Sequence, residues 1–491
     1  MTAYQIKTER TFTVIRKYSF IFTLTVAIGG LYFPKFGLAV IPVMIGLLLF
    51  SFFKGRYWCG NICAHGSLFD FVLLPLSRNA KIPQFVKSPF FVAPFFLWFF
   101  YRFTGKFIKV FSAYGSDAFW DKMGLIFVMS YVMVTIAGGL LGLVVSPRAW
   151  CQFCPMGVMQ KLSYSLGKLL GVTKLTDEKV SISKQEMCHK CGKCARVCPM
   201  QLTPYTNFSE KNQVDDVNCI RCSTCVKNCP AGILTLATED TADVIERLTP
   251  LTGYERRTRI EAVIHAIKPL KDDVIEYTFQ FTTPDDVMYH PGEFILVRIQ
   301  EEPQEMFRAY SISSYNHDNK RLSVTIKKMP NGGYGTDIVY NTFKEGDTVV
   351  LEGPMGRELR VDPHAEHVLL VGGGIGITPF LPIVTDLTRN APEVLRQVKL
   401  LYGVNKTDEF LYKDEFEQLA QASPHFEFLP TVAFDDAWDG HKGFVTDTMQ
   451  GIQHLSKYTI YMCGPKPMIT ASMKKLAELG VPKQNIYYES A

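Results

Sequence analysis

The sequence of 491 residues predicts a multidomain protein with four parts: a membrane bundle of four helices, a small α+β domain, an antiparallel β-barrel and an α/β domain with a parallel sheet. Three observations predict this architecture. Apolar segments with almost no charge fill the first third, two compact cysteine runs follow, and the second half changes from short alternating strands to strand–turn–helix units. The predicted domains are residues 1–178, 179–238, 253–362 and 363–491, with a linker at 239–252.

Composition excludes several classes of protein. Charged residues make up 20% of the chain, below the roughly 25% of ordinary soluble proteins, and the 47% of hydrophobic residues excludes intrinsic disorder. A formal net charge of +5 is small and dispersed, so we expect no nucleic-acid partner. The thirteen cysteines of so long a chain do not fit a small secreted scaffold, and their close spacing is typical of metal or cluster sites on the reducing side of a membrane.

Four apolar segments are the predicted membrane spans: residues 18–33, 37–53, 88–101 and 123–145. The first two are at or just under the lower length limit, about 17–20 residues, and the third is the shortest. Arg102 and Lys106 beside the third span would have to snorkel to the interface. Lys and Arg cluster before the first span and after the second and fourth, which predicts a multi-pass protein of a bacterial-type cytoplasmic membrane, in contact with lipid, with its soluble domains on the cytoplasmic side.

A short motif follows each predicted hairpin. Residues 56–66 and 148–157 both read R-x-W-C, a short gap, then C-x-x-G, which predicts two parallel halves related by an axis along the membrane normal. One shared iron or Fe–S centre is the functional interpretation of the two pairs, and unligated thiols or a redox-active dithiol are the alternatives. Four spans would put both pairs on one face, whereas three would separate them. The four cysteines are Cys59, Cys63, Cys151 and Cys154.

Haem is not expected in the bundle. His65 is the only histidine among the first 188 residues, so two histidines cannot ligate an iron there.

Two cysteine runs within residues 183–232 each read C-x-x-C-x-x-C-x-x-x-C-P. This is the bacterial two-cluster ferredoxin spacing, in which the fourth cysteine of each run ligates the other cluster. Paired zinc sites are the alternative, but the duplication and both trailing prolines favour clusters and one-electron transfer. The expected ligands are Cys188, Cys191, Cys194 and Cys229 for one [4Fe–4S] cluster, and Cys219, Cys222, Cys225 and Cys198 for the other.

The second half carries two further motifs. An R-x-Y-S run at residues 308–311 ends the first β region, and a glycine-rich loop follows it at residues 332–336. Residues 372–379 form a glycine-rich turn between a strand and a helix, which is typical of a phosphate site at a helix N-terminus. A C-G-P-x-x-M run occupies residues 463–468. Taken alone, the loop could be a glycine-rich hairpin and Cys463 a small buried residue.

With these motifs, residues 256–491 resemble the ferredoxin–NADP reductase superfamily. The resemblance implies that Arg308 pairs with the flavin phosphates, Tyr310 stacks on the isoalloxazine ring and Ser311 hydrogen-bonds near its N5 atom. It also implies that Cys463 lies beside the nicotinamide and that Glu489 assists hydride and proton transfer. The candidate catalytic residues are therefore Ser311, Cys463 and Glu489. The remaining cofactor-binding residues are Ser314, Gly333, Gly335 and Thr336 for the flavin, and Gly373, Gly374, Gly376, Thr378, Pro379, Gly464 and Pro465 for the nucleotide.

The resemblance implies FAD rather than FMN. We expect NADH rather than NADPH, because the segment after Gly403 lacks the Ser-plus-Arg pair common in readers of a 2′-phosphate; Lys406 there could still bind one or be solvated.

Residues 15–235 resemble the NapH/NosR family of membrane polyferredoxins. The sequence departs from the family at Ala64, where proline is usual, and in the shorter spacing of the second pair. The whole chain predicts an oxidoreductase that passes electrons from NADH through FAD and two [4Fe–4S] clusters to the membrane cysteines and on to an acceptor: a quinone, an extracytoplasmic protein or a ferredoxin. Two alternatives are a ferredoxin–NAD(P) oxidoreductase tethered by the bundle, and a metal-handling or maturation module that uses the membrane thiols.

Overall fold

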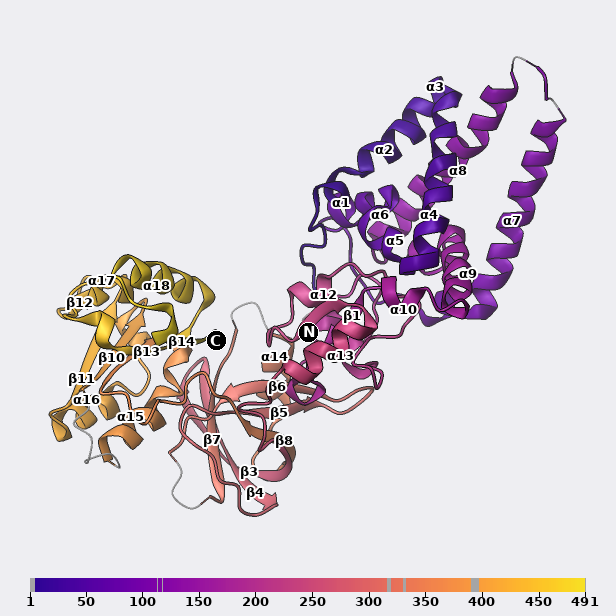
Figure 1. The fold of residues 1–491 in the computed structure, drawn as a ribbon. Coiled ribbons are helices and arrows are strands. Elements are labelled where there is room, and N and C mark those ends of the chain that lie inside the picture. Colours follow the sequence, from indigo (N-terminus) through magenta and orange to yellow (C-terminus); the bar gives the residue numbers. More distant parts are fainter. Residues whose placement is uncertain are drawn as a thin grey trace. The chain divides into compact units, whose positions relative to one another are not determined.

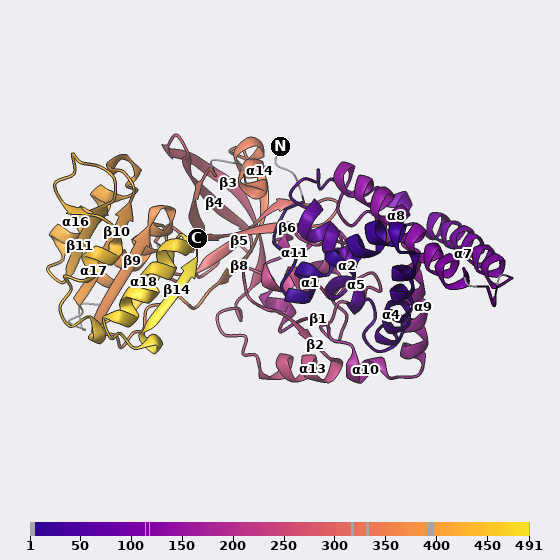
Figure 2. The same cartoon turned by 90° about the horizontal axis from the view of Figure 1, so that it is seen from above.

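The computed structural model describes residues 5–112, 114–116, 118–315, 319–329, 333–389 and 397–490. The chain divides into two compact units. The N-terminal unit consists of Ala3–Cys188 and Gly192–Pro250, and the C-terminal unit is mainly Leu251–Ala491, with His189–Cys191 assigned to it. Figures 1 and 2 show the two units in two orientations.

Long apolar helices build most of the N-terminal unit (Figure 1). Three described helical segments are long and apolar enough to cross a membrane: Val14–Tyr32, Pro34–Lys54 and Phe119–Val144. They agree with three of the four predicted spans. The helices in order are α1 (Val14–Tyr18), α2 (Phe20–Leu24), η1 (Thr25–Gly29), α3 (Gly30–Tyr32), η2 (Pro34–Ala39), α4 (Val40–Lys54), α5 (Tyr57–Asn61), α6 (Ala64–Ser67), η3 (Leu68–Leu73), η4 (Gln84–Lys87), α7 (Pro89–Phe111), α8 (Phe119–Val144), η5 (Trp150–Gln152), α9 (Pro155–Leu169) and α10 (Thr173–Thr176).

The predicted third span lies in α7, which is not among those three segments. The helix has 23 residues, about 35 Å at 1.5 Å per residue, and is therefore longer than the predicted 88–101. It contains Arg102, Lys106 and Lys109, which lower its apolar character. It packs on α8, where the rings of Phe103 and Phe127 lie 5.9 Å apart between centroids.

The cysteine-rich part of the N-terminal unit is built on a two-stranded antiparallel sheet of β1 (Lys179–Ile182) and β2 (Leu234–Ala237). Its short helices are η6 (Gln185–Met187), α11 (Lys193–Arg196), η7 (Pro204–Thr206) and α12 (Thr224–Lys227). The predicted linker contains a helix, α13 (Glu239–Leu248), which differs from the expectation. The sequence explains this helix, because acidic residues occupy its first turn and Ala242 is buried on its inner face.

The first part of the C-terminal unit is a six-stranded antiparallel sheet with the strand order β6-β5-β8-β3-β4-β7. An isolated bridge from Ile312 to Val324 connects the two edge strands, so the sheet curls into a barrel-like form. Its elements are β3 (Thr258–Lys271), β4 (Val274–Thr283), β5 (Phe294–Gln300), β6 (Met306–Ser311), β7 (Arg321–Lys327), α14 (Tyr334–Thr342) and β8 (Thr348–Met355).

The second part is a six-stranded parallel sheet with the order β12-β11-β10-β9-β13-β14. Both faces are covered: α15 and α16 pack on one, and α17 and α18 on the other (Figure 1). Strand order reverses at β9, and ligands bind at such a switch point, outside the carboxyl ends of the strands. The elements are β9 (His367–Gly373), η8 (Gly374–Ile377), α15 (Phe380–Arg389), β10 (Gln397–Val404), η9 (Thr407–Glu409), α16 (Lys413–Ala422), β11 (Phe426–Val432), β12 (His441–Lys442), α17 (Val445–Met449), η10 (Leu455–Lys457), β13 (Thr459–Gly464), α18 (Lys466–Glu478), η11 (Lys483–Asn485) and β14 (Ile486–Ser490).

Candidate functional sites

The two cysteine pairs of the repeat line one cavity in the N-terminal unit. Cys59, Cys63, Cys151 and Cys154 all contribute to its wall, and its volume is about 140 Å³. Burial raises the pKa of Cys63 to about 12, and the nearby Cys59 thiol raises it further. Burial and the neighbouring Cys151 thiol raise the pKa of Cys154 to about 11. Four thiols from two distant segments are therefore gathered in one buried site.

Two arginines cross between the repeats at this cavity. Arg56 Nη2 donates to the Cys151 carbonyl oxygen over 3.0 Å, and Arg148 Nη1 donates to the Cys59 carbonyl oxygen over 3.2 Å. Each guanidinium also approaches the thiol of its own repeat: Arg56 Nη2 lies 3.8 Å from Cys59 Sγ, and Arg148 Nη1 lies 3.6 Å from Cys151 Sγ. The arginine of each repeat thus binds the backbone of the other repeat, so the two copies of the motif depend on each other.

The repeated glycine makes room for these arginines. A Cβ atom on Gly66 would lie 2.7 Å from Arg148 Nη1, and one on Gly157 would lie 2.9 Å from Arg56 Nη2. The glycine of each repeat therefore accommodates the arginine of the other, which gives the C-x-x-G spacing a physical reason.

A buried carboxylate that the sequence patterns did not single out completes the site. Asp70 Oδ2 accepts from Arg148 Nη2 over 2.7 Å and pairs with Arg16, and Asp70 Oδ1 lies 3.5 Å from Arg10 Nη1. Burial alone would raise the pKa of Asp70, but the three guanidinium groups outweigh it and hold that pKa well below its usual value. A lone acid in an apolar segment, four residues after Gly66, was the available signal.

The structure brings together one of the two predicted ferredoxin quartets. Cys198, Cys219, Cys222 and Cys225 line a small cavity of about 20 Å³, so the fourth cysteine of the first run lies with the first three of the second. Of the other quartet, Cys188, Cys194 and Cys229 belong to one apolar cluster around β1 and β2. Both runs use left-handed backbone at the same positions: Lys190 and Gly192 in the first, Arg221 and Ser223 in the second.

The four-cysteine cavity and the ferredoxin part share one apolar core. Cys59, Cys151 and Cys222 are buried members of the same cluster. A Cβ atom on Gly60 would lie 1.9 Å from the Ile220 carbonyl oxygen, so only glycine permits the backbone approach seen here. Asn61 Nδ2 also donates to the Arg221 carbonyl oxygen over 3.2 Å. The two cysteine sites are therefore packed against each other within the N-terminal unit.

The predicted flavin residues lie on β6 and at the start of α14. Arg308, Tyr310 and Ser311 follow one another on β6, and Gly333 precedes α14. A Cβ atom on Gly335 would lie 2.5 Å from Arg308 Nε, so the glycine-rich loop packs directly on the arginine. Thr336 lies in the first turn of α14, and Ser314 Oγ lies 2.9 Å from Tyr289 Oη. A rigid cationic fork beside the N-terminus of a helix suits a pyrophosphate.

The predicted nucleotide residues gather at the carboxyl ends of β9 and β13. A Cβ atom on Gly376 would lie 2.3 Å from the Cys463 carbonyl oxygen, and one on Gly373 would lie 2.3 Å from Met468 Sδ. At Gly376 the turn therefore meets the end of β13 at a distance that only glycine allows, and at Gly373 it meets a side chain of α18. Gly374 has a positive φ of 54°, Thr378 and Pro379 lead into α15, and Gly464 and Pro465 end β13.

Two predicted catalytic residues are register partners. Cys463 on β13 pairs with Glu489 on β14 in the parallel sheet. Burial, followed by the charge of Glu358, raises the pKa of Glu489 to about 7. Burial and the Glu489 charge raise the pKa of Tyr254 to about 12, so this tyrosine, which no sequence pattern singled out, lies near the acid.

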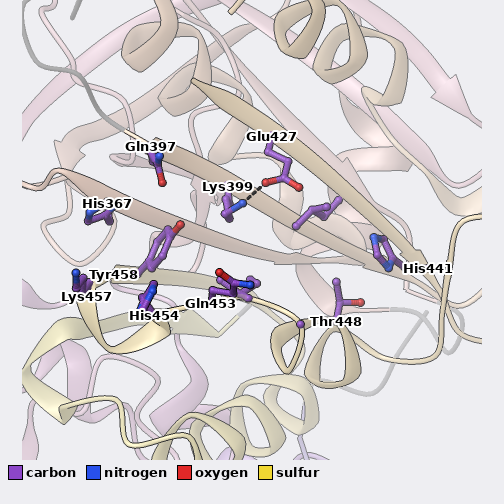
Figure 3. Close-up of a pocket in the computed structure, with 13 residues that line it drawn as sticks. His367, Gln397, Lys399, Glu427, His441, Thr448, Gln453, His454, Lys457 and Tyr458 are labelled. Atoms are coloured by element: carbon purple, nitrogen blue, oxygen red, sulfur yellow. Dashed lines mark hydrogen bonds and ion pairs between the residues drawn. The ribbon is translucent and has the colours of Figure 1, made fainter. Parts of the chain in front are cut away.

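A larger hollow of about 480 Å³ lies at the amino ends of the strands of the parallel sheet (Figure 3). His367 and Gln397 begin β9 and β10, and Lys399 on β10 forms an ion pair with Glu427 on β11. These residues are at the amino ends of the strands. The hollow is therefore not the glycine-rich nucleotide site, which is at the carboxyl ends.

Family models match four regions of the chain. Residues 261–358 match an oxidoreductase FAD-binding domain and residues 370–474 an oxidoreductase NAD-binding domain. Residues 187–234 match a 4Fe-4S dicluster domain. A 4Fe-4S binding domain matches twice, at 36–83 and 127–173, and each match contains one cysteine pair of the repeat.

Three relatives each match about half of the chain. The toluate 1,2-dioxygenase electron transfer component of Pseudomonas putida is 30% identical over 272 residues, which are 54% of this chain and 73% of that protein. NADH-cytochrome b5 reductase 1 of Emericella nidulans is 30% identical over 225 residues, covering 44% and 72%. One component of the Na(+)-translocating NADH-quinone reductase of Klebsiella pneumoniae is 32% identical over 223 residues, covering 42% and 54%.

The chain belongs to the oxidoreductase family that joins an FAD-binding domain to an NAD-binding domain. It is an NAD(P)H-dependent oxidoreductase, and its cofactors are FAD, NADH and [4Fe–4S] clusters. Residues 187–234 add an electron-transferring ferredoxin-type domain to the flavin reductase, as the sequence predicted.

Proposed function

We propose that this protein transfers electrons from NADH to a membrane or extracytoplasmic acceptor through a redox centre held by Cys59, Cys63, Cys151 and Cys154. Bound FAD would supply the conversion of hydride transfer from NADH into the release of single electrons, and [4Fe–4S] clusters held by the two cysteine runs would carry these electrons one at a time. The observation that carries the proposal is the apolar core common to Cys59, Cys151 and Cys222, because it packs the four-cysteine site against the ferredoxin cysteines.

The residues at the four-cysteine site fit an anionic iron–sulfur centre. Thiolates are soft ligands that favour iron–sulfur clusters, and four of them would bring negative charge into a buried cavity. Two buried arginines, Arg56 and Arg148, line the cavity, and Arg148 pairs with the buried Asp70. Two more buried arginines, Arg10 and Arg16, also contact Asp70, so four buried cations face one carboxylate. The excess of buried positive charge needs an anionic partner, and a thiolate-ligated centre would supply it.

The placement of the cysteine pairs also supports four spans. Both pairs line one cavity, so the chain between Cys63 and Cys151 crosses the membrane an even number of times. The helix α8 is one crossing, and α7, long enough and packed on α8, is the proposed second. This topology agrees with a NapH/NosR-type bundle, with the soluble domains on the cytoplasmic side.

In the C-terminal unit, we propose that Arg308 and the loop of Gly333, Gly335 and Thr336 bind the FAD phosphates, while Tyr310 and Ser311 contact its ring. The turn at residues 373–379, with Gly464 and Pro465, would bind the dinucleotide. Cys463 would contact the nicotinamide, and Glu489 would exchange a proton. NADH is the proposed donor.

Iron content of the purified full-length protein tests the proposal. Two ferredoxin clusters account for about 8 iron atoms per chain, and the four-cysteine centre should add to that number. Replacing Cys59 and Cys151 together with serine should remove the excess iron alone, preserve flavin reduction by NADH and block electron delivery to the acceptor. Cys463→Ser, in the other unit, is the matched control and should keep all the iron.

Two results would overturn this function. About 8 iron atoms in both proteins, with equal turnover, would make the bundle a tether for a ferredoxin–NAD(P) oxidoreductase. A different metal at the pairs, with turnover independent of it, would indicate a metal-handling module.

A further inference from the structure

We infer that Arg56 is a positioning residue that raises the reduction potential of the four-cysteine centre, because it is a buried cation at the cavity wall that no carboxylate of the described residues contacts. The inference rests on the proposed function and goes beyond it, since it assigns the control of the potential to one half of the repeat.

Arg56 is buried and incompletely bonded. It is 1% exposed, and its Nη2 atom contacts Cys59 Sγ and the Cys151 carbonyl oxygen. Its Nε and Nη1 atoms are buried without a hydrogen-bond partner among the residues that the structure describes. A guanidinium always carries its proton, so a full positive charge remains beside the thiols.

The equivalent arginine of the other repeat has a carboxylate partner. Arg148 donates to Asp70 through both Nε and Nη2, over 3.2 and 2.7 Å. Asp70 stands four residues after Gly66, and the position four residues after Gly157 is Lys161. Where one half has a carboxylate, the other half therefore has a second cation, and burial and the Arg56 charge lower the pKa of Lys161 to about 8.

A neutral donor strengthens the same side. Gln160 Nε2 donates to Cys59 Sγ over 3.1 Å, so Cys59 is approached by both Gln160 and Arg56. Hydrogen bonds to the ligating sulfur and the net charge around a centre are two of the factors that set its potential. Both act on Cys59 in the direction that favours added negative charge.

The physical step is the arrival of one electron at the centre, without a bond or a proton. A fixed positive charge nearby stabilises the reduced form more than the oxidised form, and the effect is stronger in a buried site than in water. Without the charge of Arg56, the same centre should be harder to reduce.

The experiment is a redox titration of the full-length protein, loaded with its clusters and followed by electron paramagnetic resonance. Arg56→Gln should lower the midpoint potential of the four-cysteine centre by at least ~59 mV. For one electron, this shift is a tenfold change in the ratio of reduced to oxidised centre at a fixed potential. Arg56→Lys keeps the charge and should retain most of the parent potential. The ferredoxin clusters provide an internal reference.

A second variant leaves Arg56 in place. Lys161→Asp would copy the carboxylate of the other repeat and should lower the same potential. Lys168→Asp, on the same helix α9 with its side chain 57% exposed, is the matched control and should not change it. If Arg56→Gln loses the extra iron, its potential cannot be measured. The potential of Lys161→Asp, in which Arg56 is retained, then tests whether the positive charge on this side of the site raises the potential.

Two failures are distinguishable. A parent protein with about 8 iron atoms per chain and no third signal would refute the four-cysteine centre itself. A third signal whose potential is the same in the parent, Arg56→Gln and Lys161→Asp would overturn only the role of Arg56.

Discussion

Replacing Asp70 with asparagine should strongly destabilise the N-terminal unit. The carboxylate is fully buried and faces Arg10, Arg16 and Arg148, so its removal leaves three buried cations without their counter-charge. Removing one member of a buried ion pair typically costs about 3–5 kcal/mol. Because one carboxylate serves three arginines here, we expect the upper part of that range, a large fraction of a typical stability of about 5–15 kcal/mol.

Thermal unfolding of the detergent-solubilised full-length protein measures this effect. Asp215→Asn is the matched control: it also breaks two ion pairs, with Lys168 at 3.3 Å and Lys179 at 2.6 Å, but Asp215 is half exposed. Exposed pairs contribute about 0–1 kcal/mol, so the control should melt almost like the parent. Equal melting of Asp70→Asn and Asp215→Asn would refute the idea that the arginine cluster depends on Asp70.

Three further predictions concern the C-terminal unit. Arg308→Ala should release the flavin, because the phosphates lose a bidentate cation, while the iron content stays unchanged; yellow protein at normal stoichiometry would contradict this. Cys463→Ala should retain flavin but slow its reduction by NADH in stopped-flow measurements, and an unchanged rate would exclude contact with the nicotinamide. Burial raises the folded-state pKa of Glu489 to about 7. Its contribution to stability is therefore full at low pH and is lost as the pH rises through 7. Glu489→Gln should make the melting temperature less dependent on pH between pH 5 and 8.

The parts of the molecule that sequence predicts well are those whose chemistry is local. Cysteine spacing encodes the ferredoxin runs, because a cluster needs several thiolates from one short loop, and the swapped position of Cys198 follows from the same pattern. The glycine-rich turn is equally local, since a Cβ atom on Gly376 would collide with the end of β13 and one on Gly373 with the Met468 side chain of α18. Both motifs could therefore be assigned to elements before any fold was known.

The parts that sequence could not predict depend on contacts between distant residues. Asp70 and Arg148 are 78 positions apart in the sequence, and no motif around either residue predicts their ion pair. Tyr254 lies near Glu489 only because the fold brings both to one place. The helix α13 lies within the predicted linker, and its inner face around Ala242 is defined only by the residues that it packs against.

Contacts between distant residues also make the two halves of the repeat depend on each other. Arg56 and Arg148 each bond a carbonyl of the opposite half, and each needs the opposite glycine to be free of a side chain. A single copy of the motif would leave its arginine buried without that carbonyl acceptor, and a buried donor without an acceptor costs about 1–3 kcal/mol. Duplication is thus a physical requirement of the site. The halves also differ in charge at Asp70 and Lys161, and there two structurally similar halves become electrostatically different.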